Sequence, residues 1–194
     1  MSHQQVTLHQ PVWLESWLHH RPAATDDSQR LREVLAMAEE NVVRETGGPF
    51  AAAVYDQLSG ERLSAAVNTV VRNCTALAHA ETMALGLAQQ RLQHFSLDYA
   101  GGPEVLLVTS SAPCTMCLGA IAWSGVRRVL FSTTRAEVEA IGFDEGPATP
   151  RWRSELKKRG IDVSGPRLRR QGQAVLAAYQ AHQGAVYNGP AEGR

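Results

Sequence analysis

The chain has 194 residues with 19 Lys and Arg against 19 Asp and Glu, so its formal net charge at pH 7 is +0. This length suits one compact domain with a real core, and the balanced charge indicates no general attraction to nucleic acid or to an acidic membrane. No apolar run approaches the roughly 18 residues of a membrane span, the N-terminal stretch lacks the features of a secretory signal, and 3 Cys do not make a disulfide framework. We therefore expect a reducing, cytoplasmic setting.

The predicted elements alternate between helices and strands. Residues 1–24, which contain Pro11 and Pro22, are expected to form an irregular N-terminal extension. A helix, a β-hairpin, a second helix, a strand, a short helix and another strand follow, and two helices close the chain. Their expected ranges are 28–45, 50–56 with 62–69, 79–92, 104–110, 114–124, 126–133, 152–159 and 171–183.

This order of elements indicates an α/β fold of three layers, with helices on both faces of a mixed sheet. The early hairpin is antiparallel, and strands joined by helices are expected to be parallel to each other. Residues 25–194 contain no repeat and no clear linker. They are therefore predicted to form a single domain behind the extension.

The stretch SAPCTMCLGA carries two cysteines three residues apart, directly after Pro113. This spacing places Cys114 and Cys117 on one face of a helical turn. The positive end of a helix favours the thiolate, which is the form that binds zinc. A redox dithiol and two small apolar side chains in a packed turn remain alternatives.

A second motif, AHAETMAL, opens the helix at His79 with Glu81 in its first turn. Helix starts that follow strands gather at the carboxyl edge of a sheet, where sites form. His79, Cys114 and Cys117 would supply three zinc ligands, leave the fourth position to water, and free Glu81 to carry protons. The pattern His-x-Glu followed by Pro-Cys-x-x-Cys is that of the zinc deaminases. An alternative is a closed structural site with Cys74 as fourth ligand.

The sequence resembles the cytidine-deaminase-like superfamily, and within it the guanine deaminase branch of small bacterial enzymes. The motifs HAE, PCTMC and LGA carry the resemblance to the superfamily. GGPFAAAV, Asn68, WSGV, IGFDEGP and the terminal VYN are similar to the guanine branch, over a stretch from about Gly48 to Asn188. The resemblance implies a cytidine-deaminase-like fold with about five strands, and a C-terminal part (about 151–194) that packs over the core or over a partner subunit.

The resemblance also implies hydrolysis of guanine to xanthine and ammonia by a homodimer with one Zn²⁺ per subunit. Glu81 would carry protons in the reaction. Glu145 would contact the substrate and assist proton delivery to the leaving ammonia, while Asp144 holds the loop. The residues implied to bind the purine are Asn68, Phe50, Ala80, Trp123, Glu145 and Tyr187, with Asn68 reading the N7 and O6 face, Phe50 and Trp123 sandwiching the ring, and Tyr187 covering it.

When the resemblance is set aside, the residue types leave other roles open. Asn68 could simply close a strand through a side-chain turn, and Phe50 and Trp123 could be ordinary core residues. Other substrates also remain open: a further small aminated heterocycle such as cytosine, a guanine nucleoside or an aminotriazine, or the adenosine of a tRNA. The basic segment 151–170 favours tRNA, whereas the net charge opposes it. A non-catalytic zinc module that binds a partner is the alternative of a different class. The expected partners are a small purine and a second copy of the chain, with neither membrane nor nucleic acid.

Overall fold

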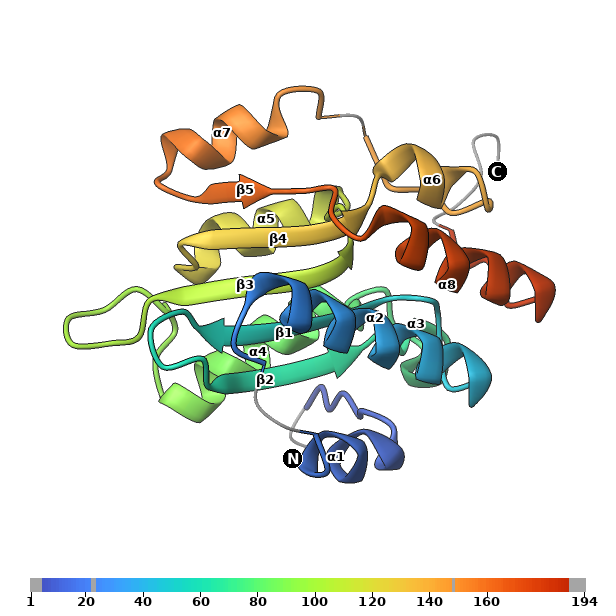
Figure 1. Cartoon of the computed structure of the whole chain (residues 1–194), viewed down its shortest axis with the longest axis horizontal. Helices are drawn as coiled ribbons and strands as arrows, with labels where there is room; N and C mark the ends of the chain where they lie inside the picture. The colour runs from blue at the N-terminus through green and yellow to red at the C-terminus, as the bar shows by residue number, and fades with distance from the viewer. Residues whose placement is uncertain (1–4, 22–23, 148, 189–194) are drawn as a thin grey trace.

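A computed structural model of the chain describes residues 5–21, 24–147 and 149–188, and it shows one sheet with helices packed on it (Figure 1). The sheet has five strands in the order β2-β1-β3-β4-β5. The strands are β1 (Ala51–Asp56), β2 (Arg62–Val67), β3 (Val105–Ser111), β4 (Arg128–Thr133) and β5 (Asp162–Ser164). The helices of the described residues are α1 (Val12–His19), α2 (Asp27–Val43), α3 (Val70–Asn73), α4 (Ala80–Leu92), α5 (Thr115–Ser124), α6 (Arg135–Glu139), α7 (Trp152–Lys158) and α8 (Arg169–Ala181).

Strand directions in the sheet are mixed, as the element order predicts. β1 pairs antiparallel with both β2 and β3, whereas β3, β4 and β5 are parallel neighbours. Because β1 runs against its neighbours, its amino end lies at the same edge as the carboxyl ends of β2, β3 and β4. The carboxyl end of β5, which is parallel to β4, lies there too, so this edge collects the segments that follow four strands and the loop that precedes β1.

Helices cover both faces of the sheet, so the predicted three-layer α/β/α fold is confirmed. On β1, Ala53 and Tyr55 pack into one core with α2 and α8, while Ala52 and Val54 pack into a second core with α4 and α5. Successive strand residues point to opposite faces, so a strand buried on both sides is apolar throughout. Figure 1 shows α2 and α8 in front of the sheet and α4 and α5 behind it.

The helices and strands expected from the sequence are all present, with ends displaced by no more than 2 residues. The prediction of an irregular extension over residues 1–24 is wrong for Val12–His19, which form α1. Leu14 of this helix is buried, and the Trp13 indole donates a hydrogen bond to Thr46 Oγ1 at 3.0 Å. The apolar pairs Trp13–Leu14 and Trp17–Leu18 are four residues apart, which is helical spacing. Of the described residues, none form a helix long and apolar enough to cross a membrane.

Candidate active site

A small cavity lies at the edge of the sheet where β2 and β3 end and β1 begins. Asn68 follows β2, Phe50 precedes β1, and Cys114 lies shortly beyond β3. The first residues of α4 and α5 border the same space because both helices start at this edge. The cavity is lined by Phe50, Asn68, His79, Glu81, Ser111, Ala112, Cys114, Phe143, Asp144, Glu145 and Tyr187.

Three side chains of this site are spaced as the ligands of one metal ion would be. His79 Nδ1 lies 3.5 Å from Cys114 Sγ and 3.7 Å from Cys117 Sγ, and the three ligand atoms lie within 4.8 Å of one another. Tetrahedral zinc, with Zn–S of about 2.3 Å and Zn–N of about 2.0–2.1 Å, sets nitrogen and sulfur about 3.6 Å apart. One imidazole and two thiolates are also donors that zinc prefers. In spacing and in chemistry, the group fits zinc.

Cys74 is outside this group in the described part of the chain. Its side chain is exposed, and its sulfur lies 3.7 Å from the carbonyl oxygen of Val71. The candidate zinc site therefore has three protein ligands and does not include Cys74. Zinc sites that keep one coordination position open have this arrangement.

The local backbone explains how the ligands are presented. His79 is the N-cap of α4 and Cys114 is the N-cap of α5, both in extended conformation. Hydrogen bonding from Cys117 lowers the pKa of Cys114 to about 4 despite its burial, and His79 adds to this effect. The same interaction with Cys114, together with burial, raises the pKa of Cys117 well above its usual value. One thiolate is thus already favoured, and metal binding would release the proton of the other.

Two carboxyl groups share the cavity with the metal-ligand group. Glu81 is buried and accepts a hydrogen bond from Thr109 Oγ1 at 3.2 Å. Burial, followed by the negative charge of Cys114, raises its pKa. Burial and the same charge raise the pKa of Glu145 to about 8. Carboxyl groups tuned toward neutral pH are suited to accepting and returning protons.

The loop between α6 and α7 presents Glu145 through its own hydrogen bonds. The Glu145 carbonyl oxygen accepts from Thr115 N–H at 3.1 Å, which ties the loop to the start of α5. Asp144 turns back and accepts from Gly146 N–H at 2.8 Å. Asp144 therefore shapes the loop, while Glu145 lines the cavity together with it.

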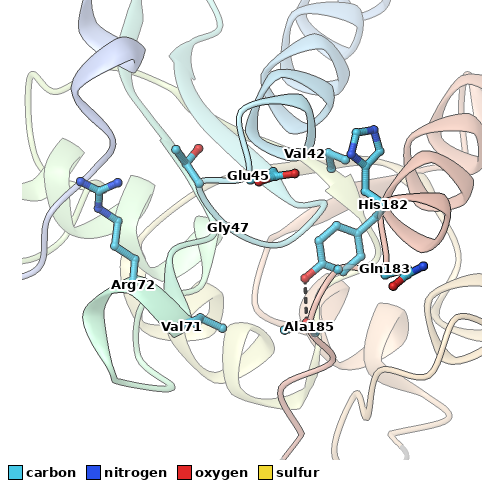
Figure 2. A pocket seen from close by; sticks show the side chains of 11 residues that line it. Val42, Glu45, Gly47, Val71, Arg72, His182, Gln183 and Ala185 are labelled. Carbon is cyan, nitrogen blue, oxygen red and sulfur yellow. Dashed lines mark hydrogen bonds between the residues drawn. The ribbon is translucent and has the colours of Figure 1, made fainter.

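A C-terminal strap, residues 185–188, crosses the mouth of the cavity. Its Asn188 side chain accepts from Asp144 N–H at 2.8 Å and donates to the Gly142 carbonyl at 2.9 Å. At the other end of the strap, the Ala185 carbonyl accepts from Tyr179 Oη at 2.7 Å, drawn as the dashed line in Figure 2. These bonds tie the strap both to the Glu145 loop and to α8.

Tyr187 fills the mouth of the cavity from this strap. Its ring packs edge-on against Phe143, with centroids 5.0 Å apart. A β-carbon on Gly48 would lie 2.0 Å from the Tyr187 hydroxyl, so only glycine allows this contact. Within the described residues that buried hydroxyl has no hydrogen-bond partner. The remaining cavity is about 40 Å³, against roughly 300 Å³ or more for typical ligand pockets, so little space is left beside Tyr187.

Two residues predicted to bind substrate do not line the cavity. Ala80 is fully buried and packs in the core beneath α4. Trp123 projects from α5 with 84% of its surface exposed. The predicted sandwich of Phe50 and Trp123 is therefore not formed within one chain. Phe143, which the sequence reasoning missed, lies 5.1 Å from Phe50 between ring centroids; its place in the IGFDEGP motif was the available signal.

A larger cavity, about 480 Å³, lies between the C-terminal ends of α2 and α8 and the α3 region (Figure 2). Its lining includes Glu45, Arg72 and His182 but none of the metal-ligand group. In the described chain, His79, Cys114, Glu81 and Glu145 therefore line the smaller cavity and not the larger one.

Comparison with known proteins agrees with this site. Residues 24–133 match the family model described as the cytidine and deoxycytidylate deaminase zinc-binding region. The chain belongs to this family, and it is a zinc-dependent aminohydrolase. Within the family, the guanine deaminases are the branch that its sequence resembles, and this resemblance is confirmed.

Two solved structures and one further relative illustrate the likeness. Guanine deaminase from Nitrosomonas europaea is 40% identical, with a TM-score of 0.86 over 93% of this chain and 100% of its own. A second solved structure, in complex with 2,6-diaminopurine, is 40% identical with a TM-score of 0.88, over 95% of this chain and 97% of its own. Guanine deaminase of Bacillus subtilis is 32% identical over 115 residues, 59% of this chain and 69% of its own.

Proposed function

We propose that the protein hydrolyses guanine to xanthine and ammonia. The observation that carries the proposal is the convergence of His79, Cys114 and Cys117 beside Glu81 in a cavity that also holds Asn68. The relatives named guanine deaminase, and the one solved with 2,6-diaminopurine, support a purine as the substrate. A water must attack the purine carbon that bears the amine, and the C–N bond to that amine must break.

His79, Cys114 and Cys117 would hold the zinc ion. When bound there, zinc supplies Lewis acidity that makes a water molecule a better nucleophile near neutral pH. Glu81 takes the proton that this water loses and returns it to the adjacent ring nitrogen. Glu145, whose pKa is raised to about 8 by burial and by the charges of Cys114 and Glu81, supplies a proton to the departing amine. The added hydroxyl loses its proton as it becomes the carbonyl of xanthine, and this proton restores Glu145. The products are then neutral ammonia and xanthine.

Asn68 would recognise the purine from the side opposite the amine. Its side chain is almost fully buried, and its Oδ1 accepts from Val70 N–H at 3.3 Å. The amide NH₂ is thereby directed away from the backbone, as a donor for the N7 and O6 acceptors of guanine. Phe50 and Phe143 supply the apolar wall of the same cavity.

Replacing Asn68 by Ala is expected to raise the KM for guanine by roughly tenfold or more, the value of one or two lost hydrogen bonds. Thermal stability should change little in comparison, because the strand ends at Val67. Steady-state kinetics with guanine, beside a melting curve, check this prediction. Unchanged kinetics would remove Asn68 from the substrate pocket.

The basic segment 151–170 does not support tRNA as the substrate. Several of its cations are paired with acids of the same chain: Arg167 with Asp27 at 3.1 Å and Arg169 with Glu137 at 2.7 Å. Lys158 likewise pairs with Glu155 at 2.8 Å. Such pairing is typical of a solvated surface that is internally balanced, whereas an RNA-binding face presents free cations to phosphates.

An ammonia-release screen tests the function directly. The panel is guanine, guanosine, cytosine, cytidine, adenine, an aminotriazine and a tRNA anticodon stem that contains the adenosine. We expect guanine to have the highest kcat/KM of the panel. Faster turnover of the tRNA adenosine would overturn the small-molecule assignment, and faster turnover of cytosine or a triazine would reassign the substrate.

We also propose that the protein is a cytoplasmic homodimer that acts in purine breakdown. Reduced thiols at Cys114 and Cys117 agree with a reducing compartment. The exposed Trp123 indole on α5 is a large apolar group of the kind that subunit interfaces cover. Sedimentation velocity tests this assembly, and a monomer at micromolar concentration would exclude it.

A further inference from the structure

A fully buried amide interrupts the apolar face of α2. Asn41 has 0% of its surface exposed, and it continues the stripe of core residues formed by Val34 and Ala38. An amide costs free energy at such a place unless its donors and acceptor are all paired. Its bonding pattern therefore indicates why the position is polar.

Both the donor and the acceptor atom of the Asn41 side chain are hydrogen-bonded, and one of its partners, Asn68, lines the active-site cavity. Its Nδ2 donates to the carbonyl oxygens of Gly48 at 2.8 Å and Asn68 at 3.0 Å. Its Oδ1 accepts from Thr46 Oγ1 at 2.6 Å. The Trp13 indole, which can only donate, occupies Thr46 Oγ1 as acceptor at 3.0 Å. The hydrogen bonds therefore form one chain from donor to acceptor, from Trp13 through Thr46 and Asn41 to the two carbonyl oxygens.

The two carbonyls belong to the residues that face the substrate and the strap. Asn68 is also held by its N–H, which donates to the Phe50 carbonyl at 2.9 Å. The Tyr187 hydroxyl packs against Gly48, in the space that a β-carbon would fill. A β-carbon on Gly47, labelled in Figure 2, would lie 1.8 Å from the Asn68 carbonyl oxygen, so the two chain segments touch backbone to backbone. Only a group with two N–H donors can bridge carbonyls at this point.

We infer that Asn41 is a positioning residue for purine recognition. By holding the Asn68 carbonyl, it fixes the direction in which the Asn68 amide enters the cavity. By holding the Gly48 carbonyl, it fixes the surface on which Tyr187 closes. The inference rests on the proposed function, because it assigns Asn68 the purine as its ligand.

Asn41→Asp tests this role with almost no change in shape. It replaces the donor NH₂ by an oxygen that faces two carbonyl oxygens. We expect the KM for guanine to rise about tenfold to a hundredfold, the effect of a small misplacement in a binding site. Zinc content and the pH dependence of kcat should stay as in the wild type, because Asn41 contacts neither Glu81 nor the metal-ligand group. Thr46→Val, which removes only the hydroxyl that orients Asn41, should raise KM less.

A double-mutant cycle separates positioning from general weakening of the fold. If Asn41 acts through Asn68, Asn41→Asp adds little to the KM of Asn68→Ala. The matched control is Tyr55→Phe, which removes another buried hydrogen bond between β1 and α2, from Tyr55 Oη to Glu33 at 2.8 Å. That control should lower the melting temperature and leave KM unchanged. If Asn41→Asp does not fold, Thr46→Val replaces it in the double-mutant cycle with Asn68→Ala.

Failure of this inference is distinguishable from failure of the proposed function. Binding of 2,6-diaminopurine, measured by calorimetry, reports on the pocket without turnover. A wild-type protein that neither binds it nor deaminates guanine overturns both. A wild type that does both, with wild-type KM in Asn41→Asp and Thr46→Val, overturns only the positioning role. The positioning role is also overturned if the increases in KM of Asn41→Asp and Asn68→Ala multiply in the double variant, because the two residues then act independently.

Discussion

Replacing Glu81 by Gln is expected to lower kcat for guanine by about 10²–10⁴-fold, the contribution of one general acid–base group, while zinc stays bound. Gln has nearly the same shape but cannot carry a proton. Glu81 is separate from the His79–Cys114–Cys117 group, so its loss removes no ligand. Ammonia release under steady-state conditions measures the first effect, and metal analysis of the purified variant measures the second.

Glu145→Gln is the matched comparison, since it changes a second buried carboxyl in the same cavity. We expect a smaller loss of kcat, because departure of the amine can also draw on protons returned by Glu81. Loss of zinc from Glu81→Gln would make Glu81 a ligand instead of a proton carrier. Full activity in that variant would remove it from the reaction.

Replacing Cys117 by Ser is expected to lower zinc affinity by more than about 10²-fold, beyond the effect of a residue that only supports a ligand, and to lower guanine deamination to background. A serine hydroxyl does not ionise near neutral pH and is a poor zinc ligand beside a thiolate. Competition with a chromophoric chelator measures the affinity. The melting temperature of the wild type should also fall when a chelator is added, because zinc binds only the folded site.

Cys74→Ser is the control for this experiment, since it changes a cysteine that is exposed and outside the ligand group. It should keep zinc, activity and the chelator-sensitive melting temperature. Cys117→Ser should melt at the same temperature with and without chelator. Loss of zinc from Cys74→Ser would restore the alternative of a closed, four-ligand site.

The sequence alone determined most of the elements and the chemical identity of the centre, whereas the short elements α3, α6 and β5 were not predicted. Apolar periodicity is a local property, so α2, α4 and α5 and the strands between them could be predicted within a turn. The motifs around His79 and Cys114 are local as well, because each ligand is the N-cap of a helix or lies in its first turn. In α1 the two local signals conflict: Trp13, Leu14, Trp17 and Leu18 are spaced as on a helix, whereas the flanking Pro11 and Pro22 favour an irregular segment.

The tertiary structure decided which of these residues meet. His79 and Cys114 are 35 residues apart in the chain and come within 3.5 Å because α4 and α5 start at one edge of the sheet. Tyr187 reaches the cavity through the strap, and Trp123 points away from it on an exposed face of α5. The role inferred for Asn41 is also invisible in a helical pattern, where a single amide interrupts an apolar face. Such contacts depend on the packing of segments distant in the chain, and no local pattern of residue types encodes them.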